Sequence, residues 1–525
     1  MIVSSAAELP PPAEDPRRVV IVGAGAVGLH LAVQLVRRGC SVVVLEAGDR
    51  TLSNFDETAF RVSGRSHQGV KIGRSISLGG TSNLWGGQLV EFQPVDIEGR
   101  SWLEGSRWPV SYDEVASYYS ETYSALGSID ELQQDASVWA KLKKTPPELS
   151  QSVEVFLTRW MNQPNLAHHY RAEVESDHRI KVVLDARTVG FTFYDTTVKG
   201  VKVVDSKGKT HIVSGDRIVL AAGTIENARL LLHSAEQSDC PWRTNDNIGR
   251  YFQDHLGGRL AYIKPRNRKA FYDAFCTIVC QGAKFQPKVR LRNGMLQERP
   301  LLNCQAMIAF ESSISENLVF LKQFVKAAVY SRKIGSITGF FRNLLACSRH
   351  MIPLMWKFVV EHRILIPSGS RIALIVQSEV EPLRDSRISV DRTRRDRYGL
   401  PQAVIDWRLS GREMEAILDF TERVRNALEQ AQMADLEIEP ALAAKDKAFL
   451  DTLHDTNHHA GGCVMGNTAV EGVVDRDLRV FGTNNFYVAG ASVFRTSSNA
   501  NTTFTAMALA TRLADHLTDT ADAKD

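Results

Sequence analysis

The first long apolar run of the chain predicts a β-strand that is buried on both faces. Residues 18–22 are β-branched and apolar after Arg18, the composition of a strand inside a parallel sheet. A glycine-rich turn follows, and residues 29–38 have the apolar spacing of a helix. A second apolar run, residues 41–45, ends at Glu46. The segment therefore predicts strand, turn, helix and strand within about 30 residues, a unit of α/β folds.

The turn of this unit has the spacing of a dinucleotide-binding site. Gly23 permits a tight turn, Gly25 lets backbone amides approach a pyrophosphate, and Gly28 allows close packing of helix on strand. Ala26 lies in the same turn, and the N-terminus of the helix presents free N–H groups to phosphate. Glu46 can accept hydrogen bonds from ribose hydroxyls. We expect these five residues to bind a dinucleotide, although the motif does not choose between NAD and FAD.

A second glycine-rich segment, residues 73–87, interleaves glycines with small polar residues and a tryptophan. Such a run forms neither a stable helix nor an interior strand. A flexible linker would not carry Leu78, Leu84 and Trp85 among its glycines. We therefore expect its backbone to lie against a flat ligand, with contacts from Arg74, Gly79, Gly80, Thr81, Asn83, Leu84, Trp85 and Gly86.

The pattern of buried strands resumes after an inserted segment near residues 90–180. Residues 216–223 predict a strand that ends in Ala222 and Gly223, which we expect at the cofactor. Thr224 then has the residue type of a helix N-cap. The cofactor-binding domain therefore continues beyond the insertion.

From about residue 256 the pattern changes to short strands separated by turns, such as residues 371–381 and 387–390, with a long amphipathic helix at residues 413–432. We expect an α/β protein with a Rossmann-like cofactor-binding domain and a second, α+β domain for the substrate, an antiparallel sheet backed by helices. The expected boundaries are a disordered tail over 1–16, the cofactor domain over 17–255 and 455–525, and the substrate domain over 256–454.

Residues 318–363 are apolar, helix-like and strongly basic, with eight Lys and Arg residues against Glu361. One interpretation is a helical lid or surface subdomain. The other is an interfacial amphipathic helix in peripheral contact with an anionic membrane or a partner.

Composition excludes several classes of protein. A hydrophobic content of 44% and a net charge of +3 over 525 residues fit a soluble globular protein with no global attraction to nucleic acid. The seven cysteines lack zinc-ligand spacing, so we expect reduced thiols and no bound metal. The N-terminus does not have the pattern of a secretory signal, and no apolar run reaches the roughly 20 residues of a membrane span. We expect a cytoplasmic protein.

The C-terminal region carries residues suited to acid–base chemistry. His458 and His459 precede a glycine-rich turn, and Asn501 stands at the start of the last predicted helix. Oxidation of an alcohol needs a base for the hydroxyl proton, and histidine is the natural base near neutral pH. We expect His458 to be the base and Asn501 to hold the same oxygen, with His459 as the competitor for the role. Cofactor contacts are expected from Gly490, Ala491, Asn501 and Thr502.

Together these segments resemble the glucose–methanol–choline (GMC) oxidoreductase family. The resemblance covers residues 17–260 and 380–517. It rests on GAGAVG with Glu46, GGTSNLWGG, VLAAGTIENARLL, NIGRYFQDH, HHAGGCVMG and NANTTFTAMALA. It implies bound FAD and oxidation of a CH–OH group to a carbonyl, with a proton taken by His458 and a hydride passed to flavin N5. The last motif looks most like the pyranose oxidase branch, which favours a sugar or glycoside as substrate.

One departure from the family concerns the flavin linkage. Asn83 stands where some pyranose oxidases carry a histidine bonded to flavin, so we expect non-covalent FAD. The electron acceptor stays open among oxygen, a quinone and a carrier protein. Two alternatives also stay open: a sterol or simple-alcohol oxidoreductase on the same scaffold, and a non-redox flavin-binding protein.

Overall fold

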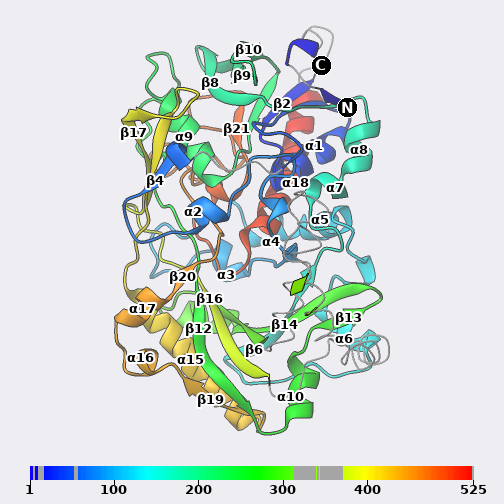
Figure 1. The fold of residues 1–525 in the computed structure, drawn as a ribbon, viewed down its shortest axis with the longest axis vertical. Helices are drawn as coiled ribbons and strands as arrows, with labels where there is room; N and C mark the ends of the chain where they lie inside the picture. The colour runs from blue at the N-terminus through cyan, green and yellow to red at the C-terminus, as the bar shows by residue number, and fades with distance from the viewer. Residues whose placement is uncertain are drawn as a thin grey trace.

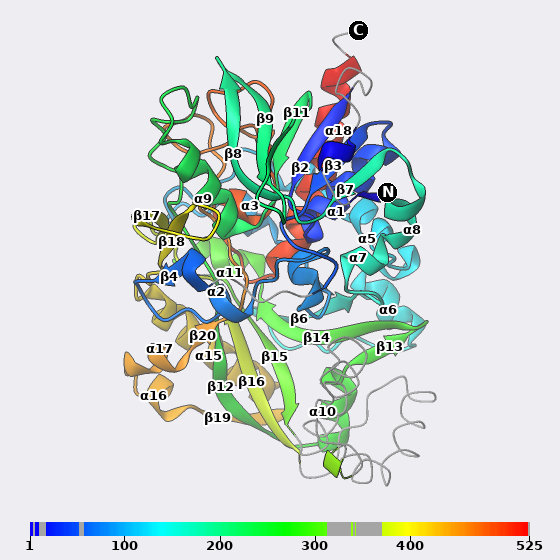
Figure 2. The same ribbon diagram turned by 45° about the horizontal axis from the view of Figure 1, so that its top comes forward.

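The computed structural model describes residues 1–3, 6–9, 17–51, 57–311, 338, 339, 342 and 370–522. It has two halves (Figures 1 and 2): a parallel sheet with its helices in one, and a large antiparallel sheet in the other. Among the described helices, none has both the length and the apolar character that a membrane span requires. The basic region expected at 318–363 lies, apart from three residues, outside the described part of the chain.

A six-stranded parallel sheet forms the centre of the first half. Most residues of its strands are buried and apolar, as the apolar runs predict, and every neighbouring pair of strands is parallel. Their carboxyl ends therefore meet at one edge, where α/β proteins bind their ligands. The expected Rossmann-like class is confirmed. The order is β1 (Ile2–Val3), β7 (Ile180–Val183), β3 (Ser41–Leu45), β2 (Arg18–Val22), β11 (Arg217–Leu220) and β21 (Phe486–Val488).

Two helices from opposite ends of the chain pack together on this sheet. They are α1 (Ala26–Arg37) and α18 (Thr502–Asp522). His30 of α1 is fully buried and contacts the Tyr170 hydroxyl at 2.8 Å and the Thr511 hydroxyl at 2.9 Å. The C-terminal helix is therefore part of the cofactor half of the molecule.

The second half is built on a nine-stranded, antiparallel sheet. The helix α15 (Arg412–Gln430) packs on one face, next to α16 (Pro440–Ala443), with α17 (Ala448–Thr452) beyond it (Figure 1). The expected sheet backed by helices is confirmed. The main path is β19 (Ala434–Ile438), β12 (Leu256–Pro265), β16 (Arg371–Ser378), β15 (Cys304–Glu311), β14 (Ala283–Leu291), β6 (Val153–Trp160) and β5 (Gln88–Leu89), with β13 (Ile278–Cys280) on β14 and β20 (His454–Asp455) on β12.

Two small sheets complete the cofactor half, and one of them corrects an expected boundary. β18 (Pro401–Asp406) pairs in parallel with β4 (Phe60–Val62), and the adjacent β17 (Arg387–Arg395) packs on α9 (Thr224–Ser234). This hairpin therefore belongs with the cofactor half, although it falls within the range 256–454. The other sheet is the meander β8 (Arg187–Tyr194), β9 (Thr197–Val204) and β10 (Thr210–Val213).

The inserted segment near 90–180 is divided between the halves. Its strand β6 joins the antiparallel sheet, while most of its helices are short.

The remaining described α-helices of the two halves are α2 (Gly69–Ile72), α3 (Pro94–Ile97), α4 (Tyr112–Ala116), α5 (Tyr119–Ala125), α6 (Asp135–Lys141), α7 (Leu166–His169), α8 (Arg171–Ser176), α10 (Arg268–Phe275) and α11 (Asn293–Glu298).

Two local expectations are wrong. The first residues of the expected tail form β1, because Ile2 pairs with Val182 and gives the sheet another strand. Thr224 is not the N-cap of α9. Gly223 has that place at φ +84°, and the Thr224 hydroxyl instead donates to the carbonyl of His459 at 2.8 Å.

Candidate active site

The glycine-rich turn between β2 and α1 leaves its backbone open on the side of a cavity. A Cβ added at Gly25 would meet no atom within 4 Å, whereas one at Gly28 would lie 2.0 Å from the carbonyl oxygen of Gly23. Gly28 therefore allows the helix to pack on the turn, and Gly25 leaves room for a ligand beside the first N–H groups of α1. This arrangement fits a bound pyrophosphate.

Glu46 lies at the end of β3, beside the same turn. Its carboxylate accepts hydrogen bonds from the backbone amides of Ala24 and Gly48, each at 2.9 Å. Burial raises the pKa of Glu46 to about 7, against these hydrogen bonds. The side chain is therefore held in place before any ligand arrives, and it lines the cavity where an adenosine ribose would fit.

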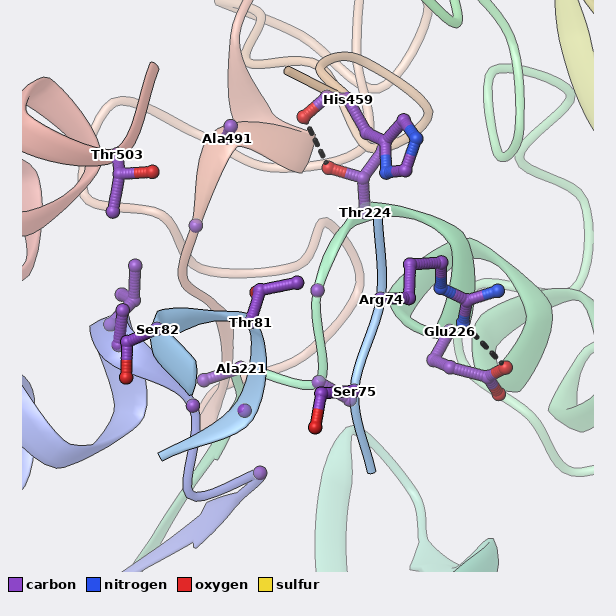
Figure 3. A pocket seen from close by; sticks show the side chains of 18 of the residues that line it. Arg74, Ser75, Thr81, Ser82, Ala221, Thr224, Glu226, His459, Ala491 and Thr503 are labelled. Carbon is purple, nitrogen blue, oxygen red and sulfur yellow. Dashed lines mark hydrogen bonds and ion pairs between the residues drawn. The ribbon is translucent and has the colours of Figure 1, made fainter. Parts of the chain in front are cut away.

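The cavity has a volume of about 500 Å³, within the range of cofactor sites. Segments far apart in the sequence surround it, as Figure 3 shows for Arg74 and Thr81, for Thr224 and Glu226, and for Ala491 and Thr503. The expected cofactor residues on its wall are Gly23, Gly25, Ala26, Glu46, Arg74, Gly80, Thr81, Leu84, Trp85, Gly86, Ala222, Gly223, Gly490, Ala491, Asn501 and Thr502.

Three expected cofactor residues, Gly28, Gly79 and Asn83, lie off this wall. The Asn83 amide donates to the carbonyls of Leu78 and Gly80 at 3.0 and 2.9 Å, and its oxygen accepts from Asn165 at 2.6 Å. Asn83 therefore holds the shape of the glycine-rich loop instead of facing the cavity.

Glu226 is a wall residue that sequence reasoning missed. It accepts a charged hydrogen bond from Arg74 at 3.0 Å, drawn in Figure 3, and pairs with Arg229 at 3.3 Å. Burial opposes its ionisation, but these two guanidinium groups outweigh burial and lower the pKa of Glu226 to about 2. Its place in the first turn of α9 was visible in the sequence, whereas its partner 152 positions away was not.

His458 and Asn501 meet at the cavity, although they come from different segments. Nε2 of His458 lies 3.0 Å from Nδ2 of Asn501, and both residues line the cavity. Gln305 and Gln377, on adjacent strands of the antiparallel sheet, both donate to the carbonyl of Asn499. The sheet therefore fixes the segment that carries Asn501.

The two adjacent histidines have different surroundings. Burial lowers the pKa of His458 to about 3, with a smaller contribution from nearby His255, so the ring is neutral as a base must be. Nε2 of His459 instead lies 3.6 Å from a carboxylate oxygen of Asp254. His459 also lines the cavity and is labelled in Figure 3, but its Nε2 faces Asp254, whereas Nε2 of His458 faces Asn501.

Asp254, His255 and His67 are further residues of the site that sequence reasoning missed. Asp254 is fully buried, and the carboxylate oxygen that faces His459 also lies 3.1 Å from Nε2 of His67. Burial opposes ionisation of Asp254, but the imidazoles of His67 and His459 outweigh it and hold its pKa well below the usual range. The sequence signal for Asp254 and His255 was the NIGRYFQDH motif. Their role depends on contacts between residues more than 180 positions apart, which the sequence does not show.

Comparisons with known proteins agree with this architecture. A model described as GMC oxidoreductase matches residues 382–510, and one described as FAD dependent oxidoreductase matches residues 18–268. The chain is 20% identical to the fructose dehydrogenase large subunit of Gluconobacter japonicus, over 95% of this chain and 97% of that protein. It is 22% identical to 2-methyl-1,2-propanediol dehydrogenase of Mycolicibacterium austroafricanum, over 96% and 95%.

A solved structure has the same fold. Pyridoxine 4-oxidase from Mesorbium loti superposes with a TM-score of 0.60 at 18% identity, covering 95% of this chain and 98% of that one.

Proposed function

This chain belongs to the GMC oxidoreductase family, uses FAD and acts on CH–OH donors, and from this premise we propose that it oxidises a sugar or glycoside with His458 as the catalytic base. The observation that carries the proposal is the contact of 3.0 Å between Nε2 of His458 and Nδ2 of Asn501 on the cavity wall. A hydroxyl oxygen at that point can give its proton to His458 and accept a hydrogen bond from Asn501.

The residues of the site can supply what the reaction needs from the protein. The neutral ring of His458 takes the hydroxyl proton as the C–H bond is broken, and the Asn501 amide holds the oxygen as it becomes a carbonyl. When bound, the flavin supplies the acceptor for the two electrons and the hydrogen of that C–H bond. Arg74, Glu46 and the N-terminus of α1 would hold the cofactor. Oxygen, a quinone or a carrier protein would then take the electrons.

The carbohydrate substrate is supported by two observations. The NANTTFTAMALA motif has the form of the pyranose oxidase branch, and one relative across nearly the whole chain is a fructose dehydrogenase. A second candidate substrate is a small aliphatic diol, because another relative of similar coverage is a diol dehydrogenase.

Non-covalent attachment of FAD is part of the proposal. The position expected to carry a flavin-linked histidine holds Asn83, and the hydrogen bonds of Asn83 keep it within its own loop. Heat or acid denaturation should therefore release all of the yellow colour into the supernatant, and flavin retained by the precipitated chain would contradict this part.

The experiment that tests the function is anaerobic reduction of the FAD-loaded protein. A monosaccharide, a glycoside, a short diol and a sterol are mixed separately with the protein, and the loss of flavin absorbance is followed by stopped flow. We expect the sugar or glycoside to bleach the flavin fastest. A faster reaction with the diol or the sterol would show that the proposed substrate class is wrong. If no alcohol bleaches the flavin, the protein is a non-redox flavin-binding protein.

His458→Ala and His459→Ala are a matched pair for the base. A positioned base contributes about 10²–10⁴-fold, so His458→Ala should slow bleaching by that factor with FAD content unchanged. His459→Ala should slow it far less. The reverse order would move the base to His459.

A further inference from the structure

We propose that His255 fixes the tautomer of His458, so that the unprotonated Nε2 of His458 faces Asn501 and the substrate; this rests on the base role proposed for His458. His255 is fully buried and does not line the cavity. Its Nδ1 lies 3.2 Å from Nδ1 of His458. It is therefore a positioning residue that acts on the substrate only through the second ring.

The second partner of His255 determines which of its nitrogens carries hydrogen. Nε2 of His255 lies 3.0 Å from the carbonyl oxygen of Ser497. A carbonyl oxygen only accepts, so this nitrogen must carry the hydrogen and donate it. Burial lowers the pKa of His255, which keeps the ring neutral. Its Nδ1 therefore has a lone pair and can only accept.

Two groups contact Nδ1 of His458, and only one of them discriminates between tautomers. The Thr456 hydroxyl, at 2.8 Å, can either donate or accept, so it is compatible with both. Nδ1 of His255, at 3.2 Å, can only accept. If Nδ1 of His458 had no hydrogen, two lone pairs would face each other inside the protein. With the hydrogen on Nδ1, the same contact becomes a hydrogen bond.

The consequence reaches the substrate side of the ring. A neutral imidazole carries one hydrogen, so Nε2 of His458 keeps its lone pair. That atom lies 3.0 Å from Asn501 Nδ2, which donates to it. The hydrogen bonds then run in one consistent direction from Asn501 through His458 and His255 to the Ser497 carbonyl. In histidine-based catalysis, the hydrogen bond made by the other ring nitrogen sets which nitrogen can act as base.

The first test measures the tautomer directly in the FAD-loaded wild-type protein. Nitrogen-15 NMR of protein labelled at the histidine ring distinguishes protonated from unprotonated ring nitrogens, and His458→Ala identifies the signals of His458. We expect hydrogen on Nδ1 of His458 and on Nε2 of His255. Hydrogen on Nε2 of His458 would overturn the proposal. This readout does not depend on turnover, so it stands even if another residue proves to be the base.

The second test compares two substitutions of nearly equal shape. His255→Asn keeps an acceptor oxygen near the position of Nδ1, whereas His255→Leu removes it. The loss of this hydrogen bond and of the ring's orientation should slow flavin reduction roughly tenfold in His255→Leu. The dissociation constant of the substrate should change little, and His255→Asn should recover most of the rate.

The NMR spectrum of the variants separates positioning from a structural role. His255→Leu should show a mixture of His458 tautomers, and His255→Asn mainly the Nδ1–H form. If both variants reduce flavin at the wild-type rate, or if His255→Leu keeps the single wild-type tautomer, the proposal is wrong. Thr456→Val is the matched control, because Thr456 does not discriminate, and it should leave the tautomer unchanged.

Discussion

One carboxylate oxygen of Asp254 accepts hydrogen bonds from the backbone amides of both His458 and His255, at 2.8 and 2.7 Å. The two histidines are 203 positions apart in the sequence, yet the same atom aligns their backbones. The other oxygen of Asp254 faces His67 and His459 at 3.1 and 3.6 Å. Asp254 thus connects the base to two further segments of the chain.

Asp254→Asn should separate the alignment of the two backbones from the effect of the negative charge beside His67 and His459. The amide oxygen can still accept from the backbone, but the negative charge beside His67 and His459 is lost. A hydrogen bond to a charged group contributes about 1.5–3 kcal/mol, so we expect a fall in the melting temperature, measured by scanning calorimetry. Flavin reduction should slow while bound FAD stays stoichiometric. A variant as stable as the wild type would show that the charge of Asp254 is unimportant.

The acidic limb of the pH profile should lie below the usual range of histidine. Burial lowers the pKa of His458 to about 3, so its ring stays unprotonated in mildly acidic solution. The rate constant for flavin reduction should therefore be flat from pH 8 to roughly pH 5, and should fall only below that as the base gains a proton. Stopped-flow traces across this range measure it. A midpoint near pH 6.5 would contradict the neutral, buried ring.

Glu46 should contribute to FAD affinity and not to chemistry. Its carboxylate is already held by the amides of Ala24 and Gly48, and it can accept from ribose hydroxyls at the cavity. Glu46→Gln should weaken FAD binding about 10- to 100-fold, since hydrogen bonds to a charged group contribute about 1.5–3 kcal/mol. Titration of the apoprotein with FAD, followed by flavin fluorescence, gives the affinity. At saturating FAD, the rate of flavin reduction should match the wild type.

Lys288 should make the stability of the protein depend on pH. It lies buried in β14 and donates to Gln88 at 3.0 Å. Burial lowers its pKa from 10.5 to about 7. Between these values the unfolded chain binds the proton and the native state does not, so the free energy of unfolding should rise with pH across this window. Below this pH window both states bind the proton, and the native state keeps the full free-energy cost of burying the charged amine.

Lys288→Met removes that penalty and tests the prediction. Each pKa unit corresponds to about 1.4 kcal/mol, so the variant should be more stable than the wild type by several kcal/mol at pH 7. The gain should shrink towards pH 10, as measured by urea unfolding. Lys284→Met is the control on the same strand, because Lys284 lies over the Trp160 ring and is partly exposed. An equal gain at both pH values would contradict the pKa of Lys288.

Metal removal should have no effect. In the described part of the chain, His67, Asp254 and His459 form a group with the composition of a metal site. The ring nitrogens already lie close enough to the carboxylate for direct ion pairing when protonated. We therefore expect elemental analysis to find no stoichiometric metal, and EDTA to leave flavin content and reduction rate unchanged. One equivalent of metal whose loss abolishes reduction would refute this expectation.

The local part of the site was predictable because it depends on spacing along the chain. The apolar run of β2, the glycines and Glu46 are consecutive, and their periodicity specifies strand, turn and helix without any distant contact. The motifs around His458 and Asn501 indicated two chemical groups suited to one reaction. The glycine-rich segment at residues 73–87 likewise indicated a ligand, although Asn83 faces its own loop.

Tertiary structure decided which of these groups meet. No local pattern places His255 against His458, Arg74 against Glu226, or β18 beside β4, because each contact depends on how the sheets pack and on the register of distant strands. Hydrogen-bond direction is likewise a property of the folded site: the Ser497 carbonyl orients one ring, and that ring orients the next. By itself, the sequence determined the cofactor fold and the kinds of reactive group, whereas packing determined which nitrogen faces the substrate.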